Sequence, residues 1–481
     1  MTIGSGSFAS LRMTMVAFAV SLGALTLSPH PVIGAAQQSP TPDFDALGFE
    51  AAERLGAYIR VRTVNPPGNE TAGAKWLQQV LAREGIAAEI FESSPGRGNL
   101  YARLPGNGSK RPIVLLSHID VVPATDSAWQ VGPWSGETRH GAVWGRGALD
   151  MKGTAIVELM TVVALKRRGV PLSRDVILVA NADEETGSTG AEWVAREKKA
   201  LLRNAEFLVN EGGHNRVTSE GRTEYYGIGV TEKMPYWVRI TAHGSPGHAS
   251  IPRPDNAAAR ISRALGRIAA WHTPIRLTPP AERYFKSLAA RETDPRRRRW
   301  LADPAAGLRD SAGLSFFTSN LYYDAILRNT VSITVLEGSD KTNVIPPEAS
   351  AELDVRLLPG ERPADFVSEL RRVIADSLVE IIPLRPERQA TTSPLDGPMI
   401  EAIRKAVQAM EPGALLVPSM LAGFTDSYYY RSIGIGAYGV SPFRLSDEDA
   451  RTVHGNDERV TVENLRFGVE FMYRMVERVG H

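Results

Sequence analysis

The sequence contains no cysteine, and that absence limits the chemistry open to the protein. Disulfides, thiolate metal ligands and cysteine nucleophiles are all excluded, so any metal must be held by His, Asp and Glu. The sequence also lacks an excess of positive or negative residues, since the formal net charge over 481 residues is +1. We therefore expect a small molecule as partner and no nucleic acid or anionic membrane.

Long apolar runs are scarce, and the one near the N-terminus has the form of a secretory signal. Within residues 1–36, Arg12 precedes apolar residues 13–27, and small residues follow at 34–36. This order is typical of a cleavable signal peptide, with an uncleaved anchor as the alternative. Beyond it no run of about 18 apolar residues occurs. The sequence predicts an exported protein, periplasmic or secreted, whose mature part is soluble.

Short apolar runs of strand type alternate with helical patterns over much of the chain. The runs cover residues 112–117, 175–180, 205–209 and 433–440, and residues 152–168 have a helical pattern. Strands that are apolar on both faces are typical of a parallel sheet covered on both sides. The sequence predicts an α/β fold with a mainly parallel sheet and helices on both faces.

From about residue 231 the pattern changes to alternating apolar and polar residues. The expected strands and helices, in β-α-β-β-α-β order, cover residues 236–242, 255–271, 331–336, 349–357, 363–378 and 379–384. This order predicts a small α+β domain inserted into the larger one. The larger domain would comprise residues 41–230 and 391–481, and the inserted domain residues 231–390. Residues 273–330 are expected to be irregular, and four arginines at 296–299 to form a solvated face.

Acidic and histidine residues directly follow the apolar strands. His118 and Asp120 follow the first strand, Glu184 and Glu185 the second, and Glu211 the third. Ligands bind at the carboxyl ends of strands in open α/β sheets, so these side chains should converge. Adjacent acids at such a place need a cation or a shared proton.

Two further residues complete a set of metal ligands without sulfur. Asp150 is surrounded by glycines that allow a sharp turn, and His454 lies near the C-terminus. Asp120, two residues after His118 on an extended chain, can orient its imidazole. His and carboxylate ligands fit Zn²⁺, with Mn²⁺ or Co²⁺ as substitutes. Five ligands with one bridging Asp suit two metals about 3.5 to 4 Å apart.

These motifs together resemble those of a zinc exopeptidase and amidohydrolase family. The family includes aminoacylase, carnosinase, carboxypeptidase S, glutamate carboxypeptidase and succinyl-diaminopimelate desuccinylase. The matching motifs are His118-x-Asp120, Gly147-Ala148-Leu149-Asp150, Glu184-Glu185, Asn210-Glu211-Gly212 and His454. The resemblance implies that His118 and Glu211 bind one metal, Glu185 and His454 the other, and that Asp150 bridges them. It further implies that Glu184 is the general base, that Asp120 orients His118, and that the Asp150–Met151 peptide is cis.

The resemblance extends to the inserted domain. His248 matches a histidine that stabilises the oxyanion, often from a partner subunit, and Asn343 matches an asparagine that touches the substrate. Arg356 matches an arginine that binds the substrate carboxylate, for which its planar fork is suited. The resemblance also implies a homodimer formed through this domain. Residues 423–427 resemble a segment that lines the substrate pocket and are assigned no catalytic role.

The resemblance implies a metallopeptidase or amidohydrolase that cleaves a peptide or amide bond adjacent to a free carboxylate. Carboxypeptidase, dipeptidase and N-acyl-amino-acid amidohydrolase all remain open, each acting through a metal-bound hydroxide and the base Glu184. One alternative is a non-catalytic zinc- or peptide-binding protein on the same fold, which would not need a free base beside a full ligand set. Another is an aminopeptidase, which would not need Arg356 or the inserted domain. His140, His214 and His272 have no ligand-like context.

Overall fold

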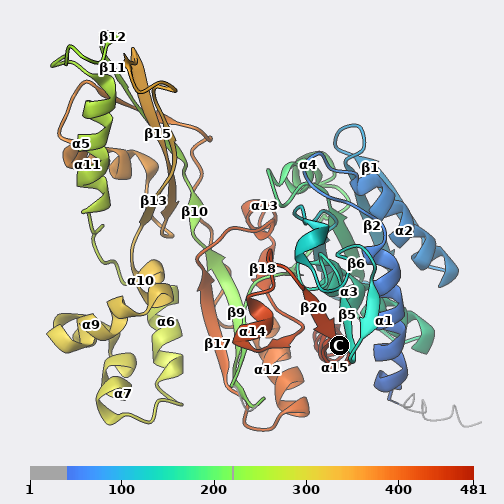
Figure 1. The fold of residues 1–481 in the computed structure, drawn as a ribbon. Coiled ribbons are helices and arrows are strands. Elements are labelled where there is room, and N and C mark those ends of the chain that lie inside the picture. The colour runs from blue at the N-terminus through green and yellow to red at the C-terminus, as the bar shows by residue number, and fades with distance from the viewer. Residues whose placement is uncertain (1–40, 219–220, 481) are drawn as a thin grey trace, which may run out of the picture. The chain divides into compact units, whose positions relative to one another are not determined.

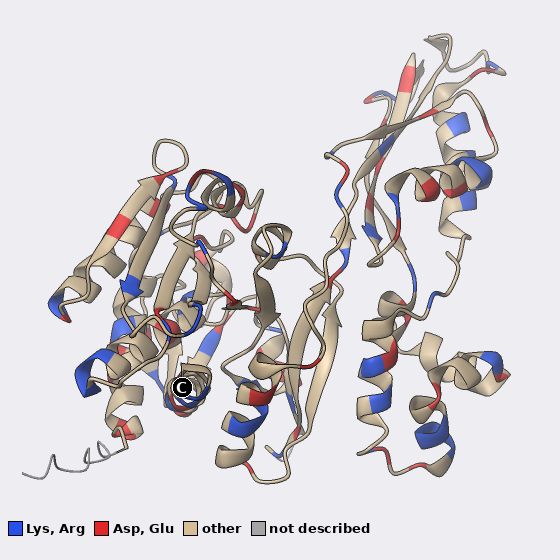
Figure 2. Ribbon diagram, turned by 180° about the vertical axis from the view of Figure 1, so that it is seen from behind, with Lys and Arg blue, Asp and Glu red and all other residues tan. Residues whose placement is uncertain are grey.

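The structure is a computed structural model that describes residues 41–218 and 221–480 (Figure 1). The predicted signal, residues 1–36, lies outside the described residues. Among the residues that are described, no helix is both long and apolar enough to cross a membrane. Basic and acidic residues are interspersed over most elements, as Figure 2 shows.

The central sheet confirms the predicted mainly parallel architecture. Its strands, in spatial order, are β1 (Ala88–Glu92), β2 (Gly98–Leu104), β6 (Val176–Asn181), β3 (Ile113–His118), β7 (Phe207–Asn210), β18 (Gly436–Gly439), β9 (Thr223–Glu232), β8 (Asn215–Val217) and β19 (Arg444–Leu445), with β17 (Leu416–Leu421) paired to β9. β3 runs parallel to both β6 and β7, and β7 runs parallel to β18. Every residue of β3, β6 and β7 is buried, which explains their unbroken apolar runs.

Helices cover both faces of this sheet, as predicted. Ile113 and Leu115 of β3 share one apolar core with the first set of helices, whereas Val114 and Leu116 pack on the opposite side with the second set. The first set is α1 (Phe44–Ile59), α2 (Glu70–Arg83), α3 (Lys152–Arg168), α12 (Pro398–Met410) and α15 (Val462–Gly480). The second set is α4 (Thr189–Glu197) and α13 (Ser427–Ser432). The alternation along one strand thus places helices on both sides.

The inserted α+β fold is also confirmed. Its antiparallel sheet contains β10 (Met234–Pro235), β15 (Glu348–Leu357), β11 (Val238–His243), β16 (Val379–Pro383) and β13 (Thr330–Glu337). Helices α5 (Ala257–Ala269) and α11 (Pro363–Ile374) share a separate apolar core with this sheet. The order of strands and helices is the one predicted, while the exact domain boundaries stay a prediction.

Residues 273–330 were expected to be irregular, and this expectation is wrong. They hold α6 (Pro279–Leu288), α7 (Pro295–Ala302), α8 (Pro304–Arg309), α9 (Ser311–Ser319) and α10 (Leu321–Leu327), here called the helical insertion. Each helix begins at a Thr, Asp or Asn whose side chain accepts backbone N–H groups. The helices are 6 to 10 residues long, too short for a clear helical period. Their apolar residues pack against Val417 and Met420 of β17.

Several shorter elements complete the fold. They are η1 (Asp126–Ala128), β4 (Glu137–Arg139), β5 (Ala142–Trp144), β12 (Gly247–His248), β14 (Val344–Ile345), α14 (Asp447–Ala450) and β20 (Arg459–Thr461). β4, β5 and β20 form a small antiparallel sheet, which connects the segment before Asp150 to the segment after His454.

Candidate active site

The predicted metal ligands converge at the carboxyl ends of the central strands. His118 Nε2 lies 3.1 Å from Asp150 Oδ1, and His454 Nε2 lies 3.1 Å from Asp150 Oδ2. His454 Nε2 is also 3.2 Å from Glu185 Oε2. The carboxylate of Asp150 therefore lies between two imidazoles, with one oxygen facing each. This is the arrangement that a bridging carboxylate requires.

The remaining two carboxylates lie on the His118 side. Potential ligand atoms of His118, Glu184 and Glu211 lie within 4.8 Å of one another, as do those of His118, Asp150 and Glu185. The two groups share His118. The structure thus brings together all five predicted ligands and the predicted base. Their individual roles stay predictions.

Asp120 fixes the backbone of the two adjacent glutamates. It is fully buried, and its carboxylate accepts hydrogen bonds from the backbone N–H groups of Glu184 and Glu185, each at 3.1 Å. Asn65 donates a third hydrogen bond to it at 2.8 Å. His118 Nδ1 lies 3.0 Å from the carbonyl oxygen of Asp120 and 3.5 Å from its carboxylate. One residue thus orients an imidazole and two carboxylate-bearing residues.

Glu458 holds the loop that carries Asp150. This fully buried carboxylate accepts three hydrogen bonds of 2.7 to 3.0 Å from backbone N–H groups of residues 147–150 and pairs with Arg146 at 2.7 Å. The Asp150–Met151 peptide is cis, which confirms the feature implied by the family resemblance. Glu458, four positions after His454, therefore connects the two segments that carry the predicted ligands Asp150 and His454.

The site concentrates negative charge away from water. Burial raises the pKa of Glu184 and of Glu211 well above the usual range, and neighbouring carboxylates raise both further. Hydrogen bonds to Asp150 and Glu185 raise the pKa of His454 to about 10. Buried carboxylates this close to one another need positive charge nearby.

The residues present fit a pair of zinc ions. Glu185 Oε1 is buried and has no hydrogen-bond partner among the described residues, as expected for an oxygen that a cation would coordinate. The available donors are imidazole nitrogens and carboxylate oxygens, which zinc accepts. The side chain of His454 is about half exposed, at 51%, so the site is open to solvent on this side.

His248 and Asn343 lie together in the inserted domain. β12 pairs with β14 and places His248 opposite Val344, the residue after Asn343. The backbone N–H of Ala249 donates to the carbonyl oxygen of Asn343 at 3.0 Å. His248 is exposed, and its Nδ1 lies 2.8 Å from the hydroxyl of Ser250.

Arg356 lies at the opposite end of the inserted sheet. It pairs with Pro235 near the end of β15, whereas β14 and Asn343 immediately precede the start of that strand at Glu348. Eight residues of strand span about 26 Å. The guanidinium makes two hydrogen bonds to Asp354, at 2.7 and 3.0 Å. The structure therefore separates Arg356 from the other two predicted substrate-binding residues.

Three residues at the site received no role from the sequence. Asn65 and Glu458 hydrogen-bond to residues that position the predicted ligands, as described above. Asp426 is fully buried, and burial raises its pKa to about 7. Asp426 Oδ2 accepts a hydrogen bond from Asn181 at 3.1 Å, while its Oδ1 has no partner in the described part of the chain. The sequence contained one indication of this role, because Asp426 is an acid within residues 423–427, the segment expected to line the substrate pocket.

Comparison with known proteins identifies the family. The profile of peptidase family M20/M25/M40 matches residues 114–478, which is most of the chain. The protein belongs to this family. It is therefore a metallohydrolase that cleaves peptide or amide bonds.

Two curated relatives and one solved structure illustrate this membership. The chain is 28% identical to the N-fatty-acyl-amino acid synthase/hydrolase PM20D1 of Mus musculus, with 88% of this chain and 87% of the relative covered. It is 28% identical to aminoacylase-1 of Mus musculus, with 86% and 91% covered. The M20 metallo-carboxypeptidase Sso-CP2 of Sulfolobus solfataricus shares the fold, with a TM-score of 0.69 at 16% identity over 90% of this chain and 99% of that one.

Proposed function

We propose that the protein hydrolyses the amide bond of N-acyl amino acids or small peptides next to a free carboxylate, using two zinc ions. The observation that carries this proposal is the position of the Asp150 carboxylate, with one oxygen 3.1 Å from each of two imidazoles. Glu184 supplies an additional carboxylate beside His118. A site with five ligands and one further acid matches what hydrolysis requires.

The ligands divide between the two ions. His118 and Glu211 would hold one ion, Glu185 and His454 the other, and Asp150 would bind both. When bound, the ions would polarise the scissile carbonyl group and lower the pKa of a water molecule. Manganese or cobalt would be accepted by the same nitrogen and oxygen donors.

Glu184 moves the proton. Its carboxylate accepts a proton from the attacking water and passes it to the nitrogen of the leaving amine. The hydrogen bond from its backbone N–H to Asp120 keeps Glu184 in place during this transfer. His248 would stabilise the oxyanion, and Arg356 with Asn343 would bind the part of the substrate that carries the carboxylate.

The names of the two curated relatives favour N-acyl amino acids over dipeptides as substrates. A non-catalytic zinc- or peptide-binding protein would not account for Glu184 beside a full set of ligands. A mixed set of N-acetyl amino acids and dipeptides tests the proposal, with free amino acid measured after loading the protein with zinc. Release that stops on chelation and returns with zinc supports it. Zinc binding without any release would favour the binding protein.

A homodimer would bring the separated residues of the inserted domain to one substrate. Because Arg356 and the pair His248–Asn343 lie at opposite ends of the sheet, we propose that each site takes Arg356 from its own chain and His248 from a partner subunit. The exposed residues Ile333 and Leu336 on β13 offer an edge strand for such an interface. A two-fold axis would make both sites equivalent.

We further propose that the protein is exported by the signal at residues 1–36, on the basis of the sequence alone. N-terminal sequencing of protein recovered outside the cytoplasm tests this. A mature chain that begins shortly after residue 36 would support export, and an intact N-terminus on cytoplasmic protein would contradict it.

A further inference from the structure

We infer that a cavity lined by residues close in the chain to two predicted metal ligands binds the acyl chain of the substrate, so that the protein prefers long apolar acyl groups. This inference rests on the proposed function and adds the acyl-side specificity to it. The cavity has a volume of about 270 Å³. The central sheet forms one wall, and α6 and α10 of the helical insertion form the other.

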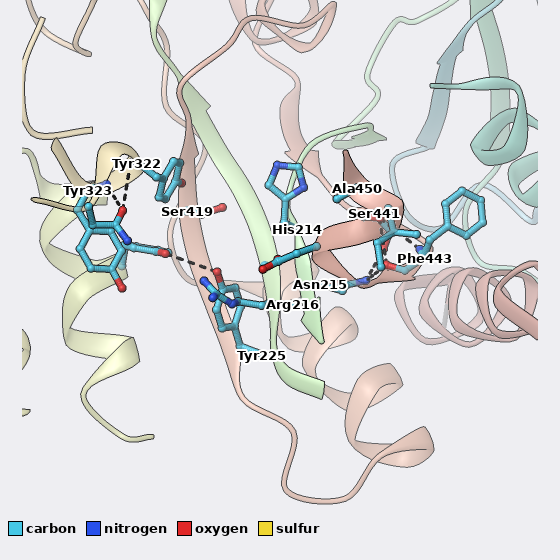
Figure 3. Close-up of a pocket in the computed structure, with 15 residues that line it drawn as sticks. His214, Asn215, Arg216, Tyr225, Tyr322, Tyr323, Ser419, Ser441, Phe443 and Ala450 are labelled. Carbon is cyan, nitrogen blue, oxygen red and sulfur yellow. Dashed lines mark hydrogen bonds between the residues drawn. The ribbon is translucent and has the colours of Figure 1, made fainter. Parts of the chain in front are cut away.

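Aromatic and aliphatic side chains make up about half of the residues that line this cavity, and most of the others are polar. The main ones are Tyr225, Tyr284, Tyr322, Tyr323, Phe443 and Leu445. Figure 3 shows Tyr322 and Tyr323 on one side of His214, and Phe443 and Ala450 on the other. A pocket with walls of this kind suits a hydrocarbon chain.

Several polar groups around the cavity already have partners within the protein. The Tyr322 hydroxyl donates to the carbonyl oxygen of Met420 at 2.6 Å. Asn215 donates from its Nδ2 atom to the carbonyl oxygens of Ser441 and Phe443, at 2.8 and 3.0 Å. Because these groups do not need a ligand as partner, an apolar chain can lie against them without leaving them unpaired.

Two residues that line the cavity lie within three or four residues of a predicted metal ligand along the chain. His214, which lines the cavity, comes three residues after Glu211. Gly439 packs so closely on this segment that an added Cβ atom would lie 2.8 Å from the carbonyl oxygen of Glu211. Ala450 lines the cavity from α14, four residues before His454. An acyl group whose carbonyl lies at the metal centre would therefore have the cavity next to it.

A larger surface groove adjoins the cavity. Its volume is about 1040 Å³, and it shares Arg216, Tyr225, Tyr284 and Tyr323 with the cavity lining. Since the same side chains line both spaces, a chain that outgrows the cavity can continue into the groove. We therefore expect activity to rise with acyl length and then to level off without a sharp cut-off.

The test uses a series of N-acyl derivatives of one amino acid, from N-acetyl to N-hexadecanoyl, with the zinc-loaded full chain. A hydrocarbon site contributes up to about fourfold in affinity per buried methylene group. We expect kcat/KM to be at least about tenfold higher for N-dodecanoyl than for N-acetyl substrate. The Ala450→Trp variant narrows the cavity and should lower this ratio at least about tenfold.

Two more variants distinguish a change in the cavity from a general loss of folding. Tyr323→Ala widens the cavity and should shift the preference to longer chains. Glu448→Trp adds the same bulk at an exposed position of α14 outside the cavity lining and should leave the ratio unchanged. Calorimetry should show that dodecanoate binds at least about tenfold more tightly than acetate to the wild type, and less so to Ala450→Trp.

The outcomes separate the two proposals. If the wild type hydrolyses N-acetyl and N-dodecanoyl substrates equally well, the acyl site is wrong and the proposed function stands. If chain length matters but Ala450→Trp and Tyr323→Ala leave the ratio unchanged, this cavity is not the acyl site. If no member of the series is hydrolysed and dipeptides are not hydrolysed either, the proposed function itself fails; if only dipeptides are hydrolysed, the acyl site is wrong.

Discussion

The buried carboxylate of Asp120 accepts a hydrogen bond from the backbone N–H of Glu184 at 3.1 Å. The same carboxylate lies 3.5 Å from Nδ1 of His118, a predicted metal ligand. Positioning of the predicted base and orientation of that ligand therefore depend on one side chain. The other hydrogen-bond partners of this carboxylate, the backbone N–H of Glu185 and the side chain of Asn65, also belong to the protein.

The Asp120→Asn variant should lose activity while keeping its fold. Asparagine offers one acceptor oxygen in place of two, so the N–H of Glu184 or of Glu185 loses its partner. We expect kcat to fall about 10- to 100-fold with little change in KM. Steady-state kinetics on an N-acyl amino acid measure this. A kcat within twofold of the wild type would show that Asp120 does not position the site.

The Glu458→Ala variant should be strongly destabilised. It leaves Arg146 buried without its partner and removes the acceptor for three backbone N–H groups. Loss of one partner of a buried pair costs about 3 to 5 kcal/mol, which urea denaturation measures as a shift in the free energy of unfolding. Glu463→Ala is the control, because its side chain is 73% exposed and its pair with Arg444 contributes at most about 1 kcal/mol. Equal shifts for both variants would refute the structural role of Glu458.

The buried Glu158 on α3 should make stability depend on pH. Burial raises its pKa well above the ordinary value of 4.5, so the folded protein keeps a proton that the unfolded chain releases. Between those two pKa values stability falls as pH rises, by up to about 1.4 kcal/mol per pH unit. The Glu158→Gln variant lacks this pH-dependent contribution. The difference between its free energy of unfolding and that of the wild type should therefore increase from pH 5 to pH 8. Urea denaturation at both pH values tests this, with Glu463→Gln as the exposed control. A difference that does not change with pH would contradict the argument.

Mixing two inactive variants tests whether His248 acts across the proposed dimer. In a mixed dimer of Glu184→Gln and His248→Ala chains, one site would combine Glu184 from one chain with His248 from the other. Half of the dimers would then have one working site of two, so activity should return to roughly a quarter of the wild-type value. Each variant alone is the control. No recovery after verified subunit exchange would show that His248 serves its own chain or has no catalytic part.

The sequence predicted the elements with regular patterns and missed those without. β3, β6 and β7 gave unbroken apolar runs because both of their faces are buried, and α5 and α11 are long enough to show a helical period. The helices of the helical insertion show no clear helical period, because a helix of six to ten residues completes only two or three turns.

The site shows the same division. Predicted ligands such as His118 and Glu211 directly follow strands. Because ligands bind at the carboxyl ends of strands, the sequence alone could predict a site there. Glu458 and Asn65 act through contacts with segments hundreds or tens of residues away, for which no local pattern exists. His214 had no ligand-like context in the sequence, and only the packing of the helical insertion against the sheet gives it a cavity to line.

The most direct measurement compares wild type, Glu184→Gln and Glu185→Gln for bound zinc and for release of amino acid from an N-acyl amino acid. We expect Glu184→Gln to keep two zinc ions per chain and to lose about 10²- to 10⁴-fold in kcat, whereas Glu185→Gln should lose zinc as well as activity. If Glu184→Gln stays active, or if it loses zinc as Glu185→Gln does, Glu184 is not the free base and the proposed mechanism is wrong.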